Sequence, residues 1–355
     1  MAPPLRICYL LMSTELCGGV RVVFDQVRAL QALGHHVTVR AVMGDHGWYP
    51  HPVPVSYMPE LDSPFPAGES PDAVIATFWT TVQPALQIGA PQTLHLCQGY
   101  EGDIREYAEL LPRIEATYRH PIAKLTISPW LKERLQQQYG PSAFPVFDIG
   151  QIVDTDLFRP LRLNWRRRLR RALGRPWRVL VVGQFGVDVK AIHNASLAVK
   201  MLRDAGRRIE LIRVSTHPLG PDEASLTPID TYHHAIPPRA MRDVMHAADV
   251  LVAPSLEGEG FGLPLAEALA CGLPCVATRI TSFTRFAPEA DYAVFAEPDN
   301  PASLTSALLR VMDDGTLRQR LERRGPHIIR ERYSGAATAR RLDAVLRGRP
   351  DGTPP

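Results

Sequence analysis

The chain has 355 residues, a length that indicates about two domains. Hydrophobic residues make up 45% of it, and 40 Lys and Arg against 37 Asp and Glu give a net charge of +3, which excludes a disulfide-held miniprotein, a disordered chain and a broadly basic nucleic-acid binder. The five cysteines lack paired C-x-x-C spacing, and the apolar run after Arg6 is too short for a signal sequence or a membrane span. We therefore expect a cytoplasmic protein, with only peripheral contact to the inner face of the membrane left open.

Strands and helices are predicted to alternate along the first part of the chain. A strand over residues 6–12 leads through a loop with Gly18 and Gly19 into a helix that ends before Gly34, and a second strand follows at 37–42. Further strand-like apolar runs lie at 73–78, 93–97 and 125–127. This alternation is typical of an α/β domain with a parallel sheet.

The same pattern begins again after a proline- and arginine-rich stretch at 160–175. A strand at 177–182, a loop from Gly183 to Lys190 and a helix ending near Gly206 are followed by three more strands, at 209–214, 250–253 and 274–278. The predicted fold class is therefore α/β with two Rossmann-like halves. We assign residues 1–162 and 163–328 to the two domains, 329–347 to a final helix and 348–355 to a disordered tail.

The segment 248–278 contains the strongest local signal. A buried strand runs into a loop with Gly258, Gly260 and Gly262, and the helix that follows directs its free amides to the carboxyl edge of the sheet, where a phosphate binds readily. Glu259 and Glu267 can accept hydrogen bonds from sugar hydroxyls, which indicates a nucleotide sugar. Taken singly, Glu267 is equally explained as a favourable anion near a helix N-terminus and Glu259 as a solvated loop residue.

This segment resembles the paired-glutamate motif of retaining glycosyltransferases of glycosyltransferase family 4. Residues 17–39, 125–135, 154–160 and 330–335 are also similar to landmarks of that family, so the resemblance spans nearly the whole chain. It implies the GT-B fold, in which two Rossmann-like domains face a cleft, the N-terminal one binding the acceptor and the C-terminal one the nucleotide sugar. It also implies that the 329–347 helix crosses back to the first domain and that neither a cofactor nor a metal is needed.

The resemblance assigns roles residue by residue. Glu267 would hold the ribose, Glu259 would contact the donor sugar as a catalytic residue, and Lys190 would reach the diphosphate. The donor-binding candidates are Gly18, Gly19, Gln184, Lys190, Glu259, Gly260, Phe261, Gly262, Leu263 and Glu267. Backbone groups of Ala235 and Ile236 are the base-binding candidates. Gln98 is the second catalytic candidate, and Tyr100 and Glu101 are the acceptor-binding candidates. The acceptor expected is a glycan, a lipid-linked sugar or a small molecule.

The chain departs from the family pattern at several of these positions. Gln184 stands where an arginine is usual and Ala191 where a glycine is usual, which puts diphosphate affinity or donor type in question. Gln98 replaces a histidine, as in the rhamnan-type subset that the run QGYE resembles, and it cannot act as a base. His95, three residues earlier, is better explained as a packed strand histidine than as a catalyst.

Two charged segments have structural explanations that we favour. Asp154 and Asp156 look like the metal-binding pair of another glycosyltransferase fold, but their place beside the interdomain stretch favours a structural role. The five arginines between 166 and 171 would make a helix basic on several sides, so a solvated linker helix is favoured over contact with anionic lipid.

Two other functions compete with glycosyl transfer. A nicotinamide dehydrogenase needs G-x-G-x-x-G after a strand, and the glycine loops at 183–186 and 258–263 both lack it. A catalytically silent sugar-nucleotide or membrane-docking module is favoured only by Gln184, and Glu259, Lys190 and Glu267 argue against it.

Overall fold

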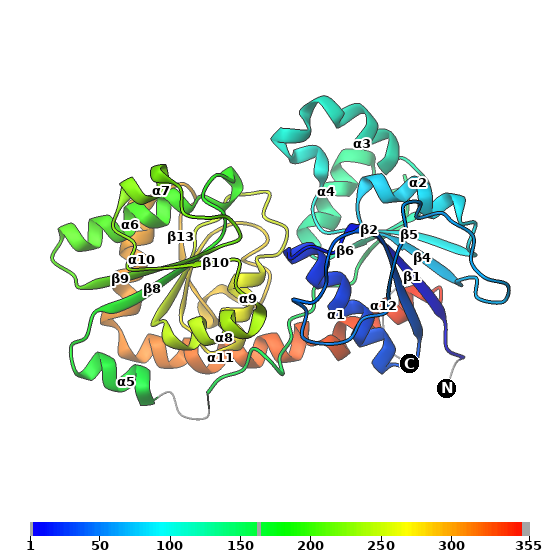
Figure 1. Ribbon diagram of the computed structural model, residues 1–355. Coiled ribbons are helices and arrows are strands. Elements are labelled where there is room, and N and C mark those ends of the chain that lie inside the picture. Colours follow the sequence, from blue (N-terminus) through cyan, green and yellow to red (C-terminus); the bar gives the residue numbers. More distant parts are fainter. Residues whose placement is uncertain (1–2, 162–164, 350–355) are drawn as a thin grey trace. The chain divides into compact units, whose positions relative to one another are not determined.

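The computed structural model describes residues 3–161 and 165–349, which form two compact units (Figure 1). The first unit comprises the chain up to Ile152 together with the residues from Gly335 onward, and the second comprises Val153–Ser334. Each unit contains one parallel sheet flanked by helices. The predicted α/β class with two Rossmann-like halves is confirmed.

The first unit is built on a seven-stranded sheet in the order β3-β2-β1-β4-β5-β6-β7, and every neighbouring pair is parallel. The strands are β1 (Arg6–Ser13), β2 (His36–Met43), β3 (Val55–Tyr57), β4 (Ala73–Ala76), β5 (Gln92–Cys97), β6 (Ala123–Thr126) and β7 (Val146–Asp148). The α-helices of this unit are α1 (Gly18–Ala32), α2 (Trp79–Gln87), α3 (Leu111–Tyr118), α4 (Pro129–Tyr139) and α12 (Gly335–Leu346). The last helix, α12, packs against α1.

The second unit is built on a six-stranded parallel sheet in the order β10-β9-β8-β11-β12-β13. Its strands are β8 (Trp177–Val182), β9 (Ile209–Ser215), β10 (Thr231–His234), β11 (Val250–Ala253), β12 (Cys275–Thr278) and β13 (Val294–Ala296). Its α-helices are α5 (Trp165–Ala172), α6 (Ile192–Asp204), α7 (Pro221–Leu226), α8 (Pro238–Ala247), α9 (Leu263–Ala270), α10 (Pro301–Asp313) and α11 (Gly315–Tyr333).

The local sequence explains why these elements form where they do. The central strands are continuous apolar runs because helices cover both faces of a parallel sheet; β4 and β11, for example, are buried at every position. Side chains of Ser128, Asn300 and Asp314 accept backbone amides at the starts of α4, α10 and α11, as N-caps do. In each sheet the strand order reverses beside the first strand of the unit, at β1/β4 and at β8/β11, which is where open α/β sheets bind ligands.

The structure corrects the predicted course of the C-terminal segment. A single helix was expected over 329–347, but α11 ends at Tyr333 in the second unit and α12 begins at Gly335 in the first. The break comes from Ser334, whose extended backbone (φ −66°, ψ 155°) cannot continue a helix. The first unit ends at Ile152, before the boundary expected at 162, because the chain after it pairs within the second unit; the amide of Val153 donates to the carbonyl of Tyr333 at 2.8 Å. Most of the expected tail, 350–355, lies outside the described residues.

The arginine run is not a solvated linker helix where its side chains are described. Arg167 on α5 is 6% exposed and donates to the carbonyls of Gly272 and Met245 at 3.0 and 3.3 Å. Arg171 lies 3.3 Å from Glu322 and 3.4 Å from Asp249. Arg167 and Arg171 therefore hold α5 against the rest of the second unit through carbonyl groups and acidic side chains. The linear sequence does not reveal these partners.

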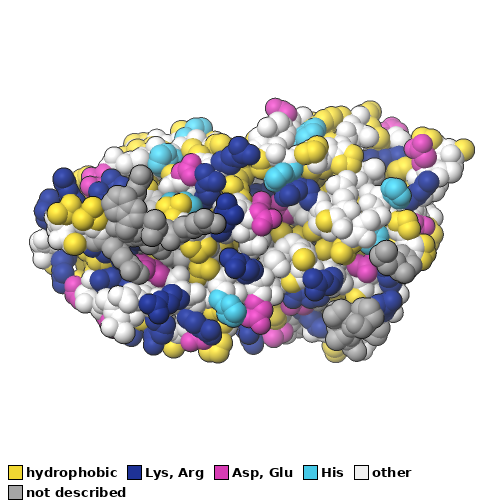
Figure 2. All heavy atoms as spheres, turned by 90° about the horizontal axis from the view of Figure 1, so that it is seen from below, with side chains coloured by type: hydrophobic (Ala, Val, Ile, Leu, Met, Phe, Trp, Pro, Cys, Tyr) yellow, Lys and Arg dark blue, Asp and Glu magenta, His cyan; other side chains and the backbone are white. Residues whose placement is uncertain are grey.

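Two further features of the fold are the distribution of charge on its surface and the length of its helices. On the face shown in Figure 2, Lys and Arg side chains are interspersed with Asp and Glu rather than gathered in one patch. Within residues 3–161 and 165–349, every helix falls short of the length and apolar character that crossing a membrane requires.

Candidate functional site

Two loops meet at the carboxyl ends of β8 and β11 and bring together predicted donor-binding residues. The loop after β8 presents Lys190, whose Nζ lies 2.6 Å from Oε2 of Glu259 on the loop after β11. The same carboxylate oxygen accepts a hydrogen bond from Ser255 Oγ at 3.0 Å. The backbones are tied as well, since the amide of Leu256 donates to the carbonyl of Val189 at 2.8 Å. A cation and a carboxylate that are far apart in sequence are thus held as one preformed pair.

The helix α9 begins directly after this pair. Its N-cap, Gly262, has φ 79° in the left-handed region, and a Cβ at this position would overlap with the ring of Phe283, so both backbone and packing require glycine. No acidic residue lies in the first turn, so its positive end is not already neutralised there. Glu267 lies on α9 and is 3% exposed. A bound anion would meet the amide of Leu263 at this end, while Pro264, the next residue of the helix, has no N–H to offer.

Phe261 contributes to the site only through its backbone. Its ring is 4% exposed and packs edge-on against Phe286 and Tyr333, with centroids 5.0 and 5.2 Å apart. This cluster anchors the Glu259–Gly262 loop to the end of α11 within the same unit. Aromatic packing therefore holds this loop in place, while its backbone amides remain at the carboxyl edge of the sheet.

The two departures in the loop after β8 have visible structural consequences. Ala191 adopts the left-handed conformation (φ 43°) that the usual glycine would adopt without strain. Gln184 donates from Nε2 to Oγ1 of Thr216 at 2.6 Å, so its amide is held toward the loop after β9.

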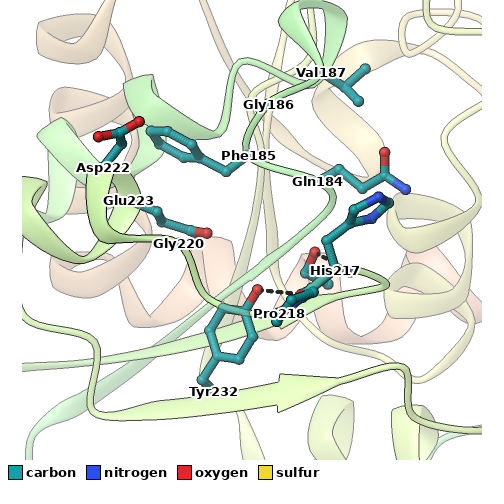
Figure 3. A pocket seen from close by; sticks show the side chains of 11 residues that line it. Gln184, Phe185, Gly186, Val187, His217, Pro218, Gly220, Asp222, Glu223 and Tyr232 are labelled. Carbon is teal, nitrogen blue, oxygen red and sulfur yellow. Dashed lines mark hydrogen bonds between the residues drawn. The ribbon is translucent and has the colours of Figure 1, made fainter.

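A pocket of about 290 Å³ opens beside Gln184 (Figure 3). Phe185 and Tyr232 supply aromatic side chains to it, and the hydroxyl of Tyr232 donates to the carbonyl of His217 at 2.7 Å. The remaining lining comes from Gln184, Gly186, Val187, Ser215, His217, Pro218, Gly220, Asp222 and Glu223. Its volume suits a single ring rather than a whole nucleotide sugar.

A buried ion pair under this pocket was not predicted from the sequence. Arg213 on β9 is fully buried, and its guanidinium donates to Oε1 of Glu223 at 2.5 Å and to the carbonyls of Val181 and Gly183 at 2.6 and 2.8 Å. It therefore fixes the point where the Gly183–Lys190 loop leaves the sheet. The one signal in the sequence is an arginine between the apolar residues Ile212 and Val214 of the strand, and only the fold supplies its partners.

The base-binding candidates lie at the end of β10. Ala235 has φ 48°, and its amide donates to the carbonyl of Ser215 at 2.8 Å. Because this amide is already hydrogen-bonded, Ala235 can contact a base only through its carbonyl. Ile236, the next residue, is half-buried.

In the first unit, Gln98 and the glycine loop are brought together. Nε2 of Gln98, just after β5, donates to the carbonyl of Gly19 at 3.1 Å. Gly18 and Gly19 form the first turn of α1, and the N-cap Cys17 accepts the amide of Val20 through its sulfur. The structure therefore joins Gln98, after β5, to the Gly18–Gly19 loop, after β1, at the carboxyl edge of the sheet.

Tyr100 and Glu101, the acceptor-binding candidates, are turned into the first unit. The hydroxyl of Tyr100 lies 2.8 Å from that of Tyr139, and Glu101, 7% exposed, accepts a hydrogen bond from Tyr118. Burial raises the pKa of the Glu101 carboxyl. Both side chains stabilise the interior of this unit in the structure.

His95 lies in the same interior, fully buried on β5 with its ring 4.9 Å from that of Tyr118. Burial, with a smaller contribution from the charge of Lys124, holds its pKa well below the usual value of 6.5. A neutral packed histidine agrees with the interpretation that we favoured. Asp154 also has the favoured structural role, because its Oδ1 accepts the amides of Asp156 and Leu157 at 3.1 and 3.0 Å.

Comparison with known proteins identifies the fold and one domain. Residues 176–314, which lie within the second unit, match the family described as Glycosyl transferases group 1. The chain is 28% identical over 231 residues to D-inositol 3-phosphate glycosyltransferase of Corynebacterium glutamicum, which covers 59% of this chain and 53% of the relative. It is 30% identical over 213 residues to MMP alpha-(1->4)-mannosyltransferase of Mycolicibacterium hassiacum, covering 58% and 48%. The chain thus spans about half the length of these curated relatives.

Solved structures match over almost the entire chain. Sucrose-phosphate synthase from Thermosynechococcus elongatus has a TM-score of 0.75 at 18% identity, covering 97% of this chain and 98% of that one. HepE of Anabaena, in complex with UDP-glucose, has a TM-score of 0.76 at 13% identity, covering 97% and 100%. The expected GT-B fold is confirmed.

Proposed function

We propose that the protein is a retaining, metal-independent glycosyltransferase of glycosyltransferase family 4 that moves a sugar from a nucleotide-diphosphate sugar to a glycan, lipid-linked or small-molecule acceptor. The observation that carries the proposal is the Lys190–Glu259 pair held at 2.6 Å beside the N-terminus of α9. The matched domain, 176–314, contains both residues and the helix. The likeness of residues 98–101 to the rhamnan-type subset supports a glycan acceptor.

In the proposed reaction, the second unit stabilises the leaving diphosphate. The ammonium of Lys190 and the free amides of α9 supply positive charge where the bond to the sugar breaks. In the unliganded protein Glu259 balances the charge of Lys190, and a bound diphosphate would take over part of that role. The carboxylate of Glu259 then becomes available to the hydroxyls of the donor sugar, and Glu267 binds the ribose.

The first unit contributes the acceptor side. Gln98, fixed to the carbonyl of Gly19, can donate a hydrogen bond but cannot remove a proton. With no base at that position, we propose that the acceptor hydroxyl attacks from the face that the diphosphate leaves and passes its proton to the departing phosphate, which retains the anomeric configuration.

A thermal-shift screen tests this proposal. The full-length protein is heated with UDP-, GDP-, dTDP- and ADP-sugars and with NAD(H), because a ligand that binds only the folded state raises the melting temperature. One nucleotide sugar should raise it, and Glu267→Ala should abolish the shift. Glu257→Ala is the matched control, since this exposed carboxylate lies in the loop before α9 and accepts hydrogen bonds from the amide and hydroxyl of Thr281.

The alternatives give different outcomes in that screen. A shift with NAD(H) alone would refute the transferase and favour a dehydrogenase. A nucleotide sugar that raises the melting temperature but is not consumed in a proton NMR time course would favour a silent binding module, the function that Gln184 in place of arginine favours.

A further inference from the structure

The helix α5 belongs to a long stretch of sequence that carries only positive charge. Between Asp156 and Asp188 the chain has no acidic residue and nine arginines, at positions 159, 162, 166, 167, 168, 170, 171, 175 and 178. Two of them, Arg167 and Arg171, are turned into the second unit, where carbonyl and acidic groups hold them. The arginines that fix α5 in place are therefore on its inner face.

The outward face of α5 is apolar instead. Leu169 and Leu173 are 47% and 65% exposed, and Ala172 between them is exposed as well. Spacings of three and four residues place these side chains on one side of the helix, opposite to Arg167 and Arg171. A helix that buries its arginines and exposes its leucines is not what water alone favours. The sequence pattern argued against a lipid-binding helix because arginines lie on several sides, and the inward turn of two of them removes that objection.

Arginines without an acidic partner border this apolar stripe. Arg208, just before β9, donates to the carbonyl of Gly174 at 3.1 Å, directly after Leu173. Arg175 follows Gly174 in the chain, and both arginines are exposed. Neither forms an ion pair with a residue in 3–161 or 165–349, the described parts of the chain. Their charges therefore remain available to a partner from outside.

The acidic residues next to these arginines in the fold already have partners. Glu210 on β9 lies 2.7 Å from Arg178, and Asp313 at the end of α10 lies 2.9 Å from Arg207. Uncompensated positive charge beside an exposed apolar stripe complements a bilayer with anionic headgroups, because arginines attract the headgroup phosphates and leucines enter the acyl boundary. A nucleic acid would match the charge but leave the leucines in water.

We propose that the outward face of α5 docks the protein onto the surface of an anionic lipid bilayer. Leu169 and Leu173 enter the boundary between headgroups and acyl chains, and Arg175 and Arg208 bind headgroup phosphates.

This docking surface lies at the amino edge of the second sheet, on the outside of the unit (Figure 1). The helix α5 leads into the amino end of β8, and the guanidinium of Arg171 lies 5.1 Å from the ring centroid of Trp177, the first residue of that strand. The Lys190–Glu259 pair lies at the carboxyl edge. Attachment through α5 leaves that pair uncovered, so the inference goes beyond the proposed function and does not depend on it.

Co-sedimentation of the full-length protein with vesicles tests the docking. Vesicles of phosphatidylcholine alone are compared with vesicles of equal parts phosphatidylcholine and phosphatidylglycerol. The wild type should bind only the anionic vesicles, and added salt should weaken binding. Leu169→Ser/Leu173→Ser should weaken it at least tenfold. Arg175→Gln/Arg208→Gln should weaken it about 25-fold, from about fivefold for each arginine, and this second variant keeps the test decisive if the first does not fold.

Matched control variants remove the same side chains elsewhere. Leu33→Ser/Leu219→Ser replaces two leucines of comparable exposure, 43% and 40%, outside α5. Arg239→Gln/Arg340→Gln replaces two exposed arginines outside this surface. Both controls should bind the anionic vesicles as the wild type does, and the melting temperature of every variant reports its folding.

The outcomes separate this inference from its rivals and from the proposed function. No binding of the wild type to anionic vesicles, or equal binding in the wild type and both α5-face variants, would overturn the docking. An equal loss in the controls would overturn it by assigning the attraction to charge and apolar area spread over the whole protein. Binding to poly(U) RNA without binding to vesicles would assign the surface to nucleic acid. Absence of a thermal shift with nucleotide sugars would refute the proposed function instead and leave the docking intact.

Discussion

Removal of the Arg213 guanidinium should destabilise the second unit strongly, and by an amount that depends on Glu223. Arg213 is fully buried and Glu223 is 3% exposed, so Arg213→Met leaves a carboxylate without its counter-charge in the interior. Breaking a buried ion pair in this way costs about 3–5 kcal/mol. The carbonyls of Val181 and Gly183 also lose their side-chain donor, which places the expected loss near the upper end of that range.

The double variant Arg213→Met/Glu223→Gln should recover part of that loss. With no charge left in the interior, we expect it to be destabilised by only about 2 kcal/mol, which gives a coupling energy of at least about 2 kcal/mol between the two side chains. Arg213→Lys keeps the charge but not the planar fork that reaches three acceptors, so it should also weaken nucleotide-sugar binding by displacing the Gly183–Lys190 loop.

Hydrogen exchange measured by mass spectrometry on peptides from β8 is the suitable assay, because it reports the opening free energy of this unit alone. The Arg213→Met variant should exchange faster in β8 and leave peptides from β1 unchanged. Additive effects of the two substitutions, within about 0.5 kcal/mol, would refute the reasoning, since independent sites behave in that way.

Three further predictions concern single positions. Ala191→Gly should leave the stability measured in thermal unfolding unchanged or slightly raise it, because relief of about 1–2 kcal/mol of left-handed strain offsets the lost methyl group and the added chain entropy. The control is Ala195→Gly, at a buried helix position, which should lower the free energy of unfolding by about 1.5 kcal/mol. Equal losses at both positions would contradict the strain at Ala191. Burial lowers the pKa of Lys124 from 10.5 to about 8, so the unfolded chain binds more protons between those values and stability should rise with pH across that window. Lys124→Met should therefore be about 2 kcal/mol more stable than the wild type at pH 7, with the difference shrinking towards pH 10 in urea titrations; a pH-independent difference would exclude the buried ammonium as its cause. Lys190→Met should weaken binding of the nucleotide sugar at least tenfold in calorimetry while leaving the melting temperature within a few degrees, and unchanged affinity would remove Lys190 from the diphosphate site.

The sequence predicts most strands of the fold because both faces of a parallel sheet are covered. Each central strand is then a short, uninterrupted apolar run, as at 73–76 and 250–253. The break at Ser334 could not be predicted in this way. Apolar residues recur on both sides of it, including Ile329 in one unit and Leu342 in the other, and only the division into units shows that they belong to separate cores.

The residues of the candidate site also differ in whether the sequence alone can predict their roles. Lys190 and Glu259 could be predicted because each lies in a loop with a characteristic local sequence, and the structure joins them. Arg213 could not, because its partners are carbonyls at the end of β8 and in the loop that follows it, and a carboxylate on α7. Tyr100 and Glu101 are acceptor candidates in the sequence because their side chains offer stacking and hydroxyl contacts, but the interior hydrogen bonds that hold them depend on α3 and α4.

The most direct test of the account is a proton NMR time course of the nucleotide sugar selected by the thermal-shift screen, incubated with full-length protein and a methyl glycoside. We expect the donor signal to disappear and a glycoside product with the donor's anomeric configuration to appear, at a rate that falls at least a hundredfold in Glu259→Gln. A product of inverted configuration, or the same rate in Glu259→Gln, would contradict a retaining transfer at the Lys190–Glu259 site.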